Sequence, residues 1–97
     1  MKKSKYQVRH ILVQHQYEAL DLLKKINEGI SFQELAKKYS ICSSSKNGGD
    51  LGPLNMNQAD SDFEEACLNL KTNEITKKPI RTRFGYHLIQ RIDSSEI

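Results

Sequence analysis

The sequence predicts a single α+β domain with a mainly antiparallel sheet, and three observations support this prediction. The chain has 97 residues, which suffice for one hydrophobic core but not for two. Strand-like segments occur near both ends of the chain, and segments with helical periodicity lie between them. The predicted order is strand, helix, helix, loop, helix, strand, strand, which lacks the regular strand-helix alternation that is typical of a parallel sheet.

Residues 8–13 (VRHILV) form the first predicted strand because they are short, apolar and rich in β-branched side chains. Side chains alternate between the two faces of a strand, and here both faces are mostly apolar. This predicts a central strand rather than an edge strand. The two predicted faces are Val8, His10 and Leu12 on one side and Arg9, Ile11 and Val13 on the other.

Two helices follow. The apolar positions between residues 17 and 28 recur with the spacing of an amphipathic helix, and Gly29 predicts its end. Ser31 and Glu34 then have the spacing of a capping box, which predicts a second helix over residues 32–39.

Residues 40–58 show no periodicity and contain Gly48, Gly49, Gly52 and Pro53, which predicts a long loop. A loop of this length inside a compact domain is uncommon unless it is functional. Its glycines lack the Gly-Lys-Ser/Thr ending of a phosphate-binding loop, so turn formation explains them better.

The rest of the chain predicts a third helix and two strands. Ser61 and Glu64 repeat the capping-box spacing at the start of the helix. Residues 75–82 are strand-like, Phe84-Gly85 marks a turn or bulge, and residues 86–92 form the closing strand. We therefore expect a basic tail over residues 1–5, one domain over residues 6–93 and a second tail over residues 94–97.

The composition excludes several functional classes. Fifteen Lys and Arg against twelve Asp and Glu give a net charge of +3, without the aromatic-interleaved basic stripe of a nucleic-acid surface. No apolar run is long enough for a signal peptide or a membrane span. The two cysteines have the spacing of neither a disulfide framework nor a zinc site. We expect a cytoplasmic monomer that binds no nucleic acid, membrane, metal or cofactor.

Several polar residues could carry chemistry. His10 and His87 both lie in apolar strands and need hydrogen-bond partners, which they could supply to each other if those strands are neighbours. Each histidine alone is more typical of a satisfied core residue than of a catalytic one, but the pair, with Thr82 nearby, favours a hydrogen-bond network. Cys42 lies in the long loop, as either a small apolar residue or a reactive group, whereas Cys67 is expected in the core. A cysteine hydrolase using Cys42 is an alternative that no local motif supports.

Six segments occur in the order found in the parvulin family of peptidyl-prolyl cis/trans isomerases, and the chain resembles that family, in particular its small stand-alone bacterial form. Each segment alone is weak, but the ordered set is specific and covers nearly the whole chain. The segments are HILV at residues 10–13, FQELAKKYS at 32–40, CSSSK at 42–46, GGDLG at 48–52, FE at 63–64 and FGYHLI at 84–89.

The resemblance implies a four-stranded antiparallel sheet surrounded by helices, with the site on its concave face. It also implies catalytic roles for four residues: paired central histidines at His10 and His87, an active-site cysteine at Cys42, and a hydroxyl in the same network at Thr82.

The resemblance further implies an apolar pocket for the substrate proline, formed by Leu51, Phe63 and Phe84. Position 59 departs from the family pattern, because the methionine that usually lines this pocket is replaced by Ala59. We expect the smaller side chain to leave a wider or wetter pocket.

The expected activity is noncovalent cis/trans isomerisation of Xaa-Pro bonds in peptides and in unfolded or flexible protein segments. Phosphate-directed relatives carry a basic loop after the first strand, whereas Gln14, His15 and Gln16 occupy this position here, so no phosphate requirement is expected. The alternative is a parvulin-like polypeptide-binding module of the chaperone type, with little or no isomerase activity.

Overall fold

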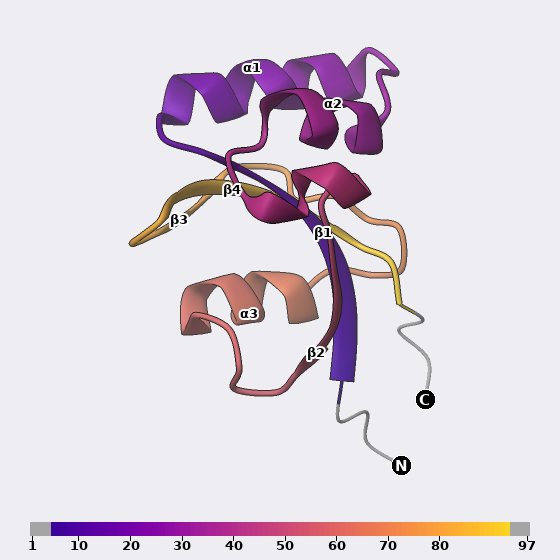
Figure 1. Ribbon diagram of the computed structural model, residues 1–97, viewed down its shortest axis with the longest axis vertical. Coiled ribbons are helices and arrows are strands. Elements are labelled where there is room, and N and C mark those ends of the chain that lie inside the picture. The colour runs from indigo at the N-terminus through magenta and orange to yellow at the C-terminus, as the bar shows by residue number, and fades with distance from the viewer. Residues whose placement is uncertain (1–4, 94–97) are drawn as a thin grey trace.

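The computed structural model describes residues 5–93 and contains one four-stranded antiparallel sheet, as the sequence resemblance implied. The strand order is β2-β1-β4-β3, so the first and last strands of the chain lie side by side at the centre. Three α-helices and one short 3₁₀ helix complete the fold (Figure 1). In chain order the elements are β1 (Lys5–Val13), α1 (Gln16–Asn27), α2 (Phe32–Tyr39), η1 (Ser43–Asn47), β2 (Asp50–Asn55), α3 (Ser61–Leu68), β3 (Ile80–Thr82) and β4 (Gly85–Arg91).

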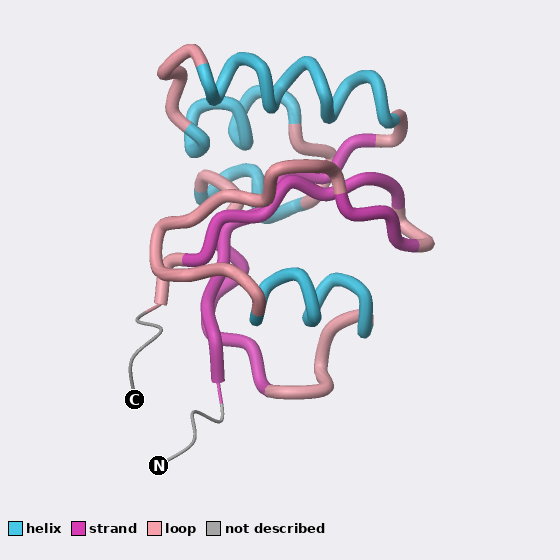
Figure 2. The backbone as a smooth tube through the Cα atoms, turned by 180° about the vertical axis from the view of Figure 1, so that it is seen from behind, coloured by secondary structure: helices cyan, strands magenta, loops and turns pink. Residues whose placement is uncertain are grey.

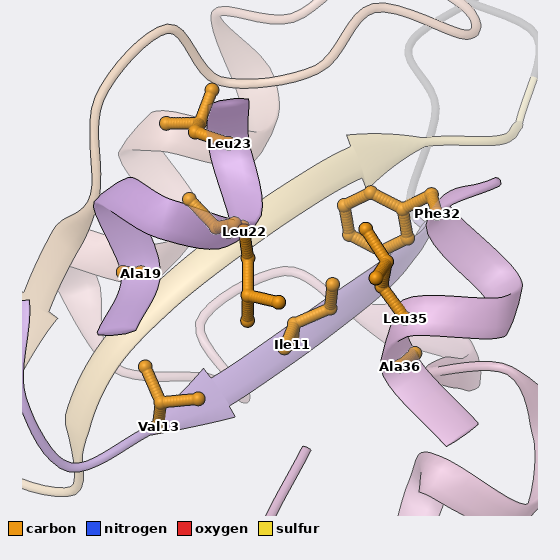
Figure 3. Close-up of a cluster of buried hydrophobic side chains, with 9 residues drawn as sticks. Ile11, Val13, Ala19, Leu22, Leu23, Phe32, Leu35 and Ala36 are labelled. Carbon is orange, nitrogen blue, oxygen red and sulfur yellow. The ribbon is translucent and has the colours of Figure 1, made fainter. Parts of the chain in front are cut away.

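The apolar side chains on the two faces of β1 belong to two separate apolar clusters, as the predicted alternation requires. Ile11 and Val13 pack beneath α1 and α2 (Figure 3). Leu88 of β4 belongs to the same cluster. Val8 lies on the opposite face with Ile89 of β4, where α3 covers the sheet. The sheet is therefore a middle layer, with α1 and α2 on one side and α3 on the other (Figure 1).

The predicted long loop over residues 40–58 is wrong in part, because it contains η1 and β2. β2 lies at the edge of the sheet and pairs only with β1. An edge strand tolerates Pro53, which has no N–H to donate, and Gly52. Its half-buried residues do not alternate clearly between apolar and polar, so the usual strand signal is missing.

α2 has the predicted bounds, and α1 begins and ends one residue before the predicted positions. The Ser31 hydroxyl accepts a hydrogen bond from the Glu34 N–H, as the predicted cap requires. For α3 the predicted cap at Ser61 is wrong, because the carboxylate of Asp60 accepts from the Asp62 N–H at 3.0 Å. An aspartate is as good a helix cap as a serine, and Asp60 stands one residue earlier.

The chain ends differ slightly from the prediction. β1 begins at Lys5, which pairs with Asn55, so Lys5 belongs to the sheet rather than to the predicted basic tail. The rest of that tail, residues 1–4, and the predicted tail over residues 94–97 lie outside the described residues. The loop between α3 and β3 returns beside β4, where Ile75 bridges Gln90 (Figure 2). No helix between residues 5 and 93 has the length and apolar character needed to cross a membrane.

Candidate functional site

A cavity of about 380 Å³ opens on the α3 side of the sheet. It is lined mainly by apolar atoms, and it lies within the size range of small-ligand pockets. Seven of the eight predicted site residues line it: His10, Cys42, Ala59, Phe63, Thr82, Phe84 and His87. Four further lining residues were not predicted: Leu12, Gln58, Asp60 and Arg83.

Leu51 is the predicted substrate-binding residue that does not line this cavity. It lies in β2, half-buried, and packs against the cluster that contains Phe63, Val8 and Tyr6. Its side chain therefore belongs to the apolar cluster beside the cavity, not to the cavity wall.

The two predicted histidines meet at the base of the cavity. His10 faces Ile89 in the β1–β4 register and His87 faces Leu12, so the imidazoles are diagonal neighbours across two strands. Their Nδ1 atoms are 3.0 Å apart, and each residue is only 4% exposed. The other ring nitrogen of His87, Nε2, is 2.7 Å from the hydroxyl of Thr82 in β3. A hydrogen-bonded chain thus links three adjacent strands.

Burial keeps both imidazoles neutral at physiological pH. Desolvation and, to a smaller extent, the nearby His87 ring lower the pKa of His10 to about 4. Desolvation likewise lowers the pKa of His87 to about 4, with a smaller opposing effect from Asp60. In a neutral pair, one Nδ1 must carry a hydrogen and donate the hydrogen bond, and the other Nδ1 must accept it. His10 Nε2 is buried and has no hydrogen-bond partner among the described residues, so the chain ends there.

Phe63 of α3 provides the apolar wall above this chain. Its ring is 4% exposed and makes edge contacts with both imidazoles, with centroid distances of 5.7 Å to His10 and 5.0 Å to His87. Aromatic rings prefer this edge-to-face geometry, which fixes the orientation of all three rings. The result is a rigid, largely apolar surface without a permanent charge.

Cys42 reaches the cavity because the end of α2 is tied to β1. The Ser40 hydroxyl accepts hydrogen bonds from the Leu12 N–H at 3.0 Å and the Cys42 N–H at 3.4 Å. The Ile41 N–H donates to the Leu12 carbonyl at 2.9 Å. Sequence reasoning missed Ser40, whose only signal is its position directly after the helix.

The second cysteine lies in the core, as predicted. Cys67 is fully buried, and burial raises the pKa of its thiol to about 12, so it stays protonated. Within residues 5–93, no group of three or more His, Cys, Asp or Glu side chains is arranged to hold a metal ion.

Glu64 anchors the loop that forms another wall of the cavity. One of its carboxylate oxygens accepts from the Tyr6 hydroxyl at 3.1 Å and from the Asn57 N–H at 2.8 Å. Asn57 has a left-handed φ of 67° and begins the stretch that leads to Ala59 and Asp60. Glu64 thereby connects this loop to both α3 and β1. The sequence predicted that the Glu64 carboxylate would pair with Ser61 in a capping box, whereas it binds Tyr6 and Asn57 instead.

The neutral histidine pair predicts that stability falls as the pH falls from 7.5 to 5. The pKa of each ring is about 4 in the folded protein and about 6.5 in the unfolded chain, so the unfolded chain binds more protons in this window. We expect a loss of roughly 2 kcal/mol for each ring, levelling off near pH 4. Urea unfolding at pH 7.5, 6 and 5 measures it. The His15→Gln variant, which lacks an exposed histidine, should lose the same amount; a flat profile would contradict neutral burial.

The hydrogen bond from the Asn57 N–H to Glu64 should protect the Asn57 amide from hydrogen exchange. Glu64→Ala should accelerate exchange of the Asn57 amide by about tenfold, because a hydrogen bond to a charged acceptor is lost. Glu64→Gln should restore most of the protection, since its amide oxygen can accept the same bond. Glu65→Ala, which removes an exposed glutamate from the same helix, is the control and should have no effect. Unchanged protection in Glu64→Ala would show that the loop is held by other contacts.

Comparison with known proteins places these features in a family. Residues 9–93 match the Rotamase family model, described as the PPIC-type PPIase domain. The foldase protein PrsA of Bacillus subtilis is 40% identical over 92 residues, which are 94% of this chain and 31% of that protein. PrsA of Caldanaerobacter subterraneus is 45% identical over 83 residues, which are 84% of this chain and 27% of that protein. The chain thus spans about a third of the length of the curated relatives it matches.

Solved structures show the same fold. The crystal structure of PrsA from Bacillus subtilis superposes with a TM-score of 0.90 at 38% identity, over 97% of this chain and 37% of that one. The solution structure of NmPin, the parvulin of Nitrosopumilus maritimus, gives a TM-score of 0.82 at 38% identity, over 96% of this chain and 100% of that one. With a family model that covers residues 9–93 and a histidine pair at the base of an apolar cavity, the chain belongs to the parvulin family of PPIC-type PPIase domains.

Proposed function

We propose that this chain catalyses cis/trans isomerisation of Xaa-Pro bonds in peptides and in flexible or unfolded protein segments, without a covalent intermediate. The observation that carries the proposal is the neutral, hydrogen-bonded chain of His10, His87 and Thr82 beneath an apolar cavity. Membership of the PPIase family supports the same reaction. The proposed catalytic residues are His10, Cys42, Thr82 and His87, and those proposed to contact the proline are Ala59, Phe63 and Phe84.

The cavity suits the electronic change in the reaction. Rotation about an Xaa-Pro bond breaks amide resonance, which costs roughly 20 kcal/mol. The twisted amide is less polar than the planar one, so an apolar wall such as Phe63 favours it over the planar, solvated form. Ala59 and the exposed ring of Phe84 also line the cavity, and we propose that an extended peptide enters beside them.

The histidines hold the site together rather than transfer protons. A general base works best with a pKa near the working pH, whereas the pKa of both rings is about 4. Within residues 5–93 the Cys42 thiol forms no hydrogen bond to either imidazole, so the ion pair of a cysteine hydrolase is not assembled. We propose that Cys42 instead tunes the electrostatic field at the carbonyl of the rotating bond.

Phosphate recognition is not part of the proposal. Only Gln14 and His15 separate the end of β1 from the start of α1, so this connection offers neither an arginine nor a lysine.

Cytoplasmic location and a monomeric state remain predictions from the sequence.

The decisive test is exchange NMR on a short Xaa-Pro peptide, with and without the protein. We expect faster cis/trans exchange with the wild-type chain and about tenfold slower catalysis with Cys42→Ser, since removing one electrostatic contribution costs about 1.4 kcal/mol. Thr76→Ser, which keeps a buried hydroxyl outside the cavity, is the control and should retain full activity.

Two outcomes would contradict this proposal in different ways. Peptide shift changes without faster exchange would support the alternative of a polypeptide-binding module. Complete loss in Cys42→Ser, together with a peptide adduct on the wild-type Cys42 sulfur that keeps the Xaa-Pro bond intact and is seen by mass spectrometry, would support covalent catalysis.

A further inference from the structure

Two charged side chains, Arg83 and Asp60, line the described part of the cavity. Arg83 lies in the two-residue turn between β3 and β4, while Asp60 precedes α3. Neither residue belongs to the histidine chain at the base. Asp60 has a small electrostatic effect on His87, and both charges are placed to act on a ligand in the cavity.

Arg83 is free to meet a ligand. Its side chain is exposed, and its guanidinium lies 4.9 Å from the ring centroid of Phe84, which is itself 58% exposed. Within residues 5–93 it forms no ion pair with an aspartate or glutamate. The contact with Phe84 keeps the guanidinium at the rim of the cavity without neutralising it.

Asp60 is partly compensated, in contrast to Arg83. Its carboxylate caps α3 and accepts from the Asp62 N–H, and the positive end of the helix dipole stabilises its charge. Arg83 is the one basic residue of the described chain that lines the cavity. Its charge is not offset by an ion pair within residues 5–93, whereas that of Asp60 is partly satisfied by the helix, so Arg83 supplies a positive charge for a ligand in the cavity.

We propose that Arg83 makes this chain prefer substrates with an acidic side chain next to the isomerising proline. This inference rests on the proposed isomerase function and specifies its substrate class. A carboxylate is the matching group, because one guanidinium can bind it with two parallel hydrogen bonds. The short connection between β1 and α1 adds no second cation for a doubly charged phosphate.

The expected preference is modest. An ion pair at an exposed rim contributes up to about 1 kcal/mol, so catalytic efficiency should rise about two- to fivefold for an acidic neighbour. Because salt screens exposed pairs, the preference should shrink at 0.5 M NaCl.

Exchange NMR on matched peptides tests the inference. Glu-Pro and Pro-Glu peptides are compared with their uncharged Gln-Pro and Pro-Gln counterparts, which have nearly the same shape. The wild-type chain should isomerise the Glu-Pro peptide, the Pro-Glu peptide or both two- to fivefold faster than the matching glutamine peptide. Arg83→Gln should abolish this difference. Arg81→Gln is the matched control, since Arg81 is also exposed but lies outside the cavity lining, beside Tyr86. It should keep the preference.

The possible failures are distinguishable. Equal rates for all four peptides would overturn the inference and leave the isomerase function intact, as would a preference that survives in Arg83→Gln. Absence of catalysis with every peptide would refute the proposed function itself. Arg83→Glu supplies an independent check, because it should shift the preference toward Lys-Pro or Pro-Lys peptides, and an unshifted preference would again overturn the inference.

Discussion

The hydrogen bond between the two imidazoles in the central strands is the interaction on which the rest of the site depends. It requires β1 and β4 to be neighbours with Leu12 opposite His87, because only then do the two Nδ1 atoms lie 3.0 Å apart. A slip of one residue would turn one ring to the other face of the sheet. Two buried imidazoles without partners would each cost about 1 to 3 kcal/mol, so this register is favoured by polar as well as apolar contacts.

The walls of the cavity are then set by elements that pack against this pair. α3 contributes Phe63, whose ring touches both imidazoles, and β3 contributes Thr82. Cys42 arrives from the other side of the sheet through hydrogen bonds of Ser40 and Ile41 to β1. Backbone geometry also matters here: a Cβ at Gly49 would collide with the His10 carbonyl oxygen, so only glycine lets this segment approach β1.

Much of this arrangement could be predicted from local patterns. The alternation in β1 correctly assigned Val8 and Ile11 to opposite faces, and the Ser31 cap marked the start of α2, because both signals depend on neighbouring residues. β2 was missed because an edge strand with glycine and proline carries no clear periodicity. The roles of Ser40 and Glu64 were also missed, since their partners are 28 and 58 positions away in Leu12 and Tyr6. Arg91, buried against the Leu70 carbonyl and Asp93, had no sequence signal either.

The site requires that both histidines are neutral and share one proton between their Nδ1 atoms. Imidazole ¹⁵N NMR of the folded protein as a function of pH tests this most directly. We predict that, at pH 7, one ring is protonated at Nδ1 and the other at Nε2, and that neither titrates above about pH 5. A cationic ring at pH 7, or titration of His10 or His87 near pH 6.5, would show that the pair is not buried in its neutral form.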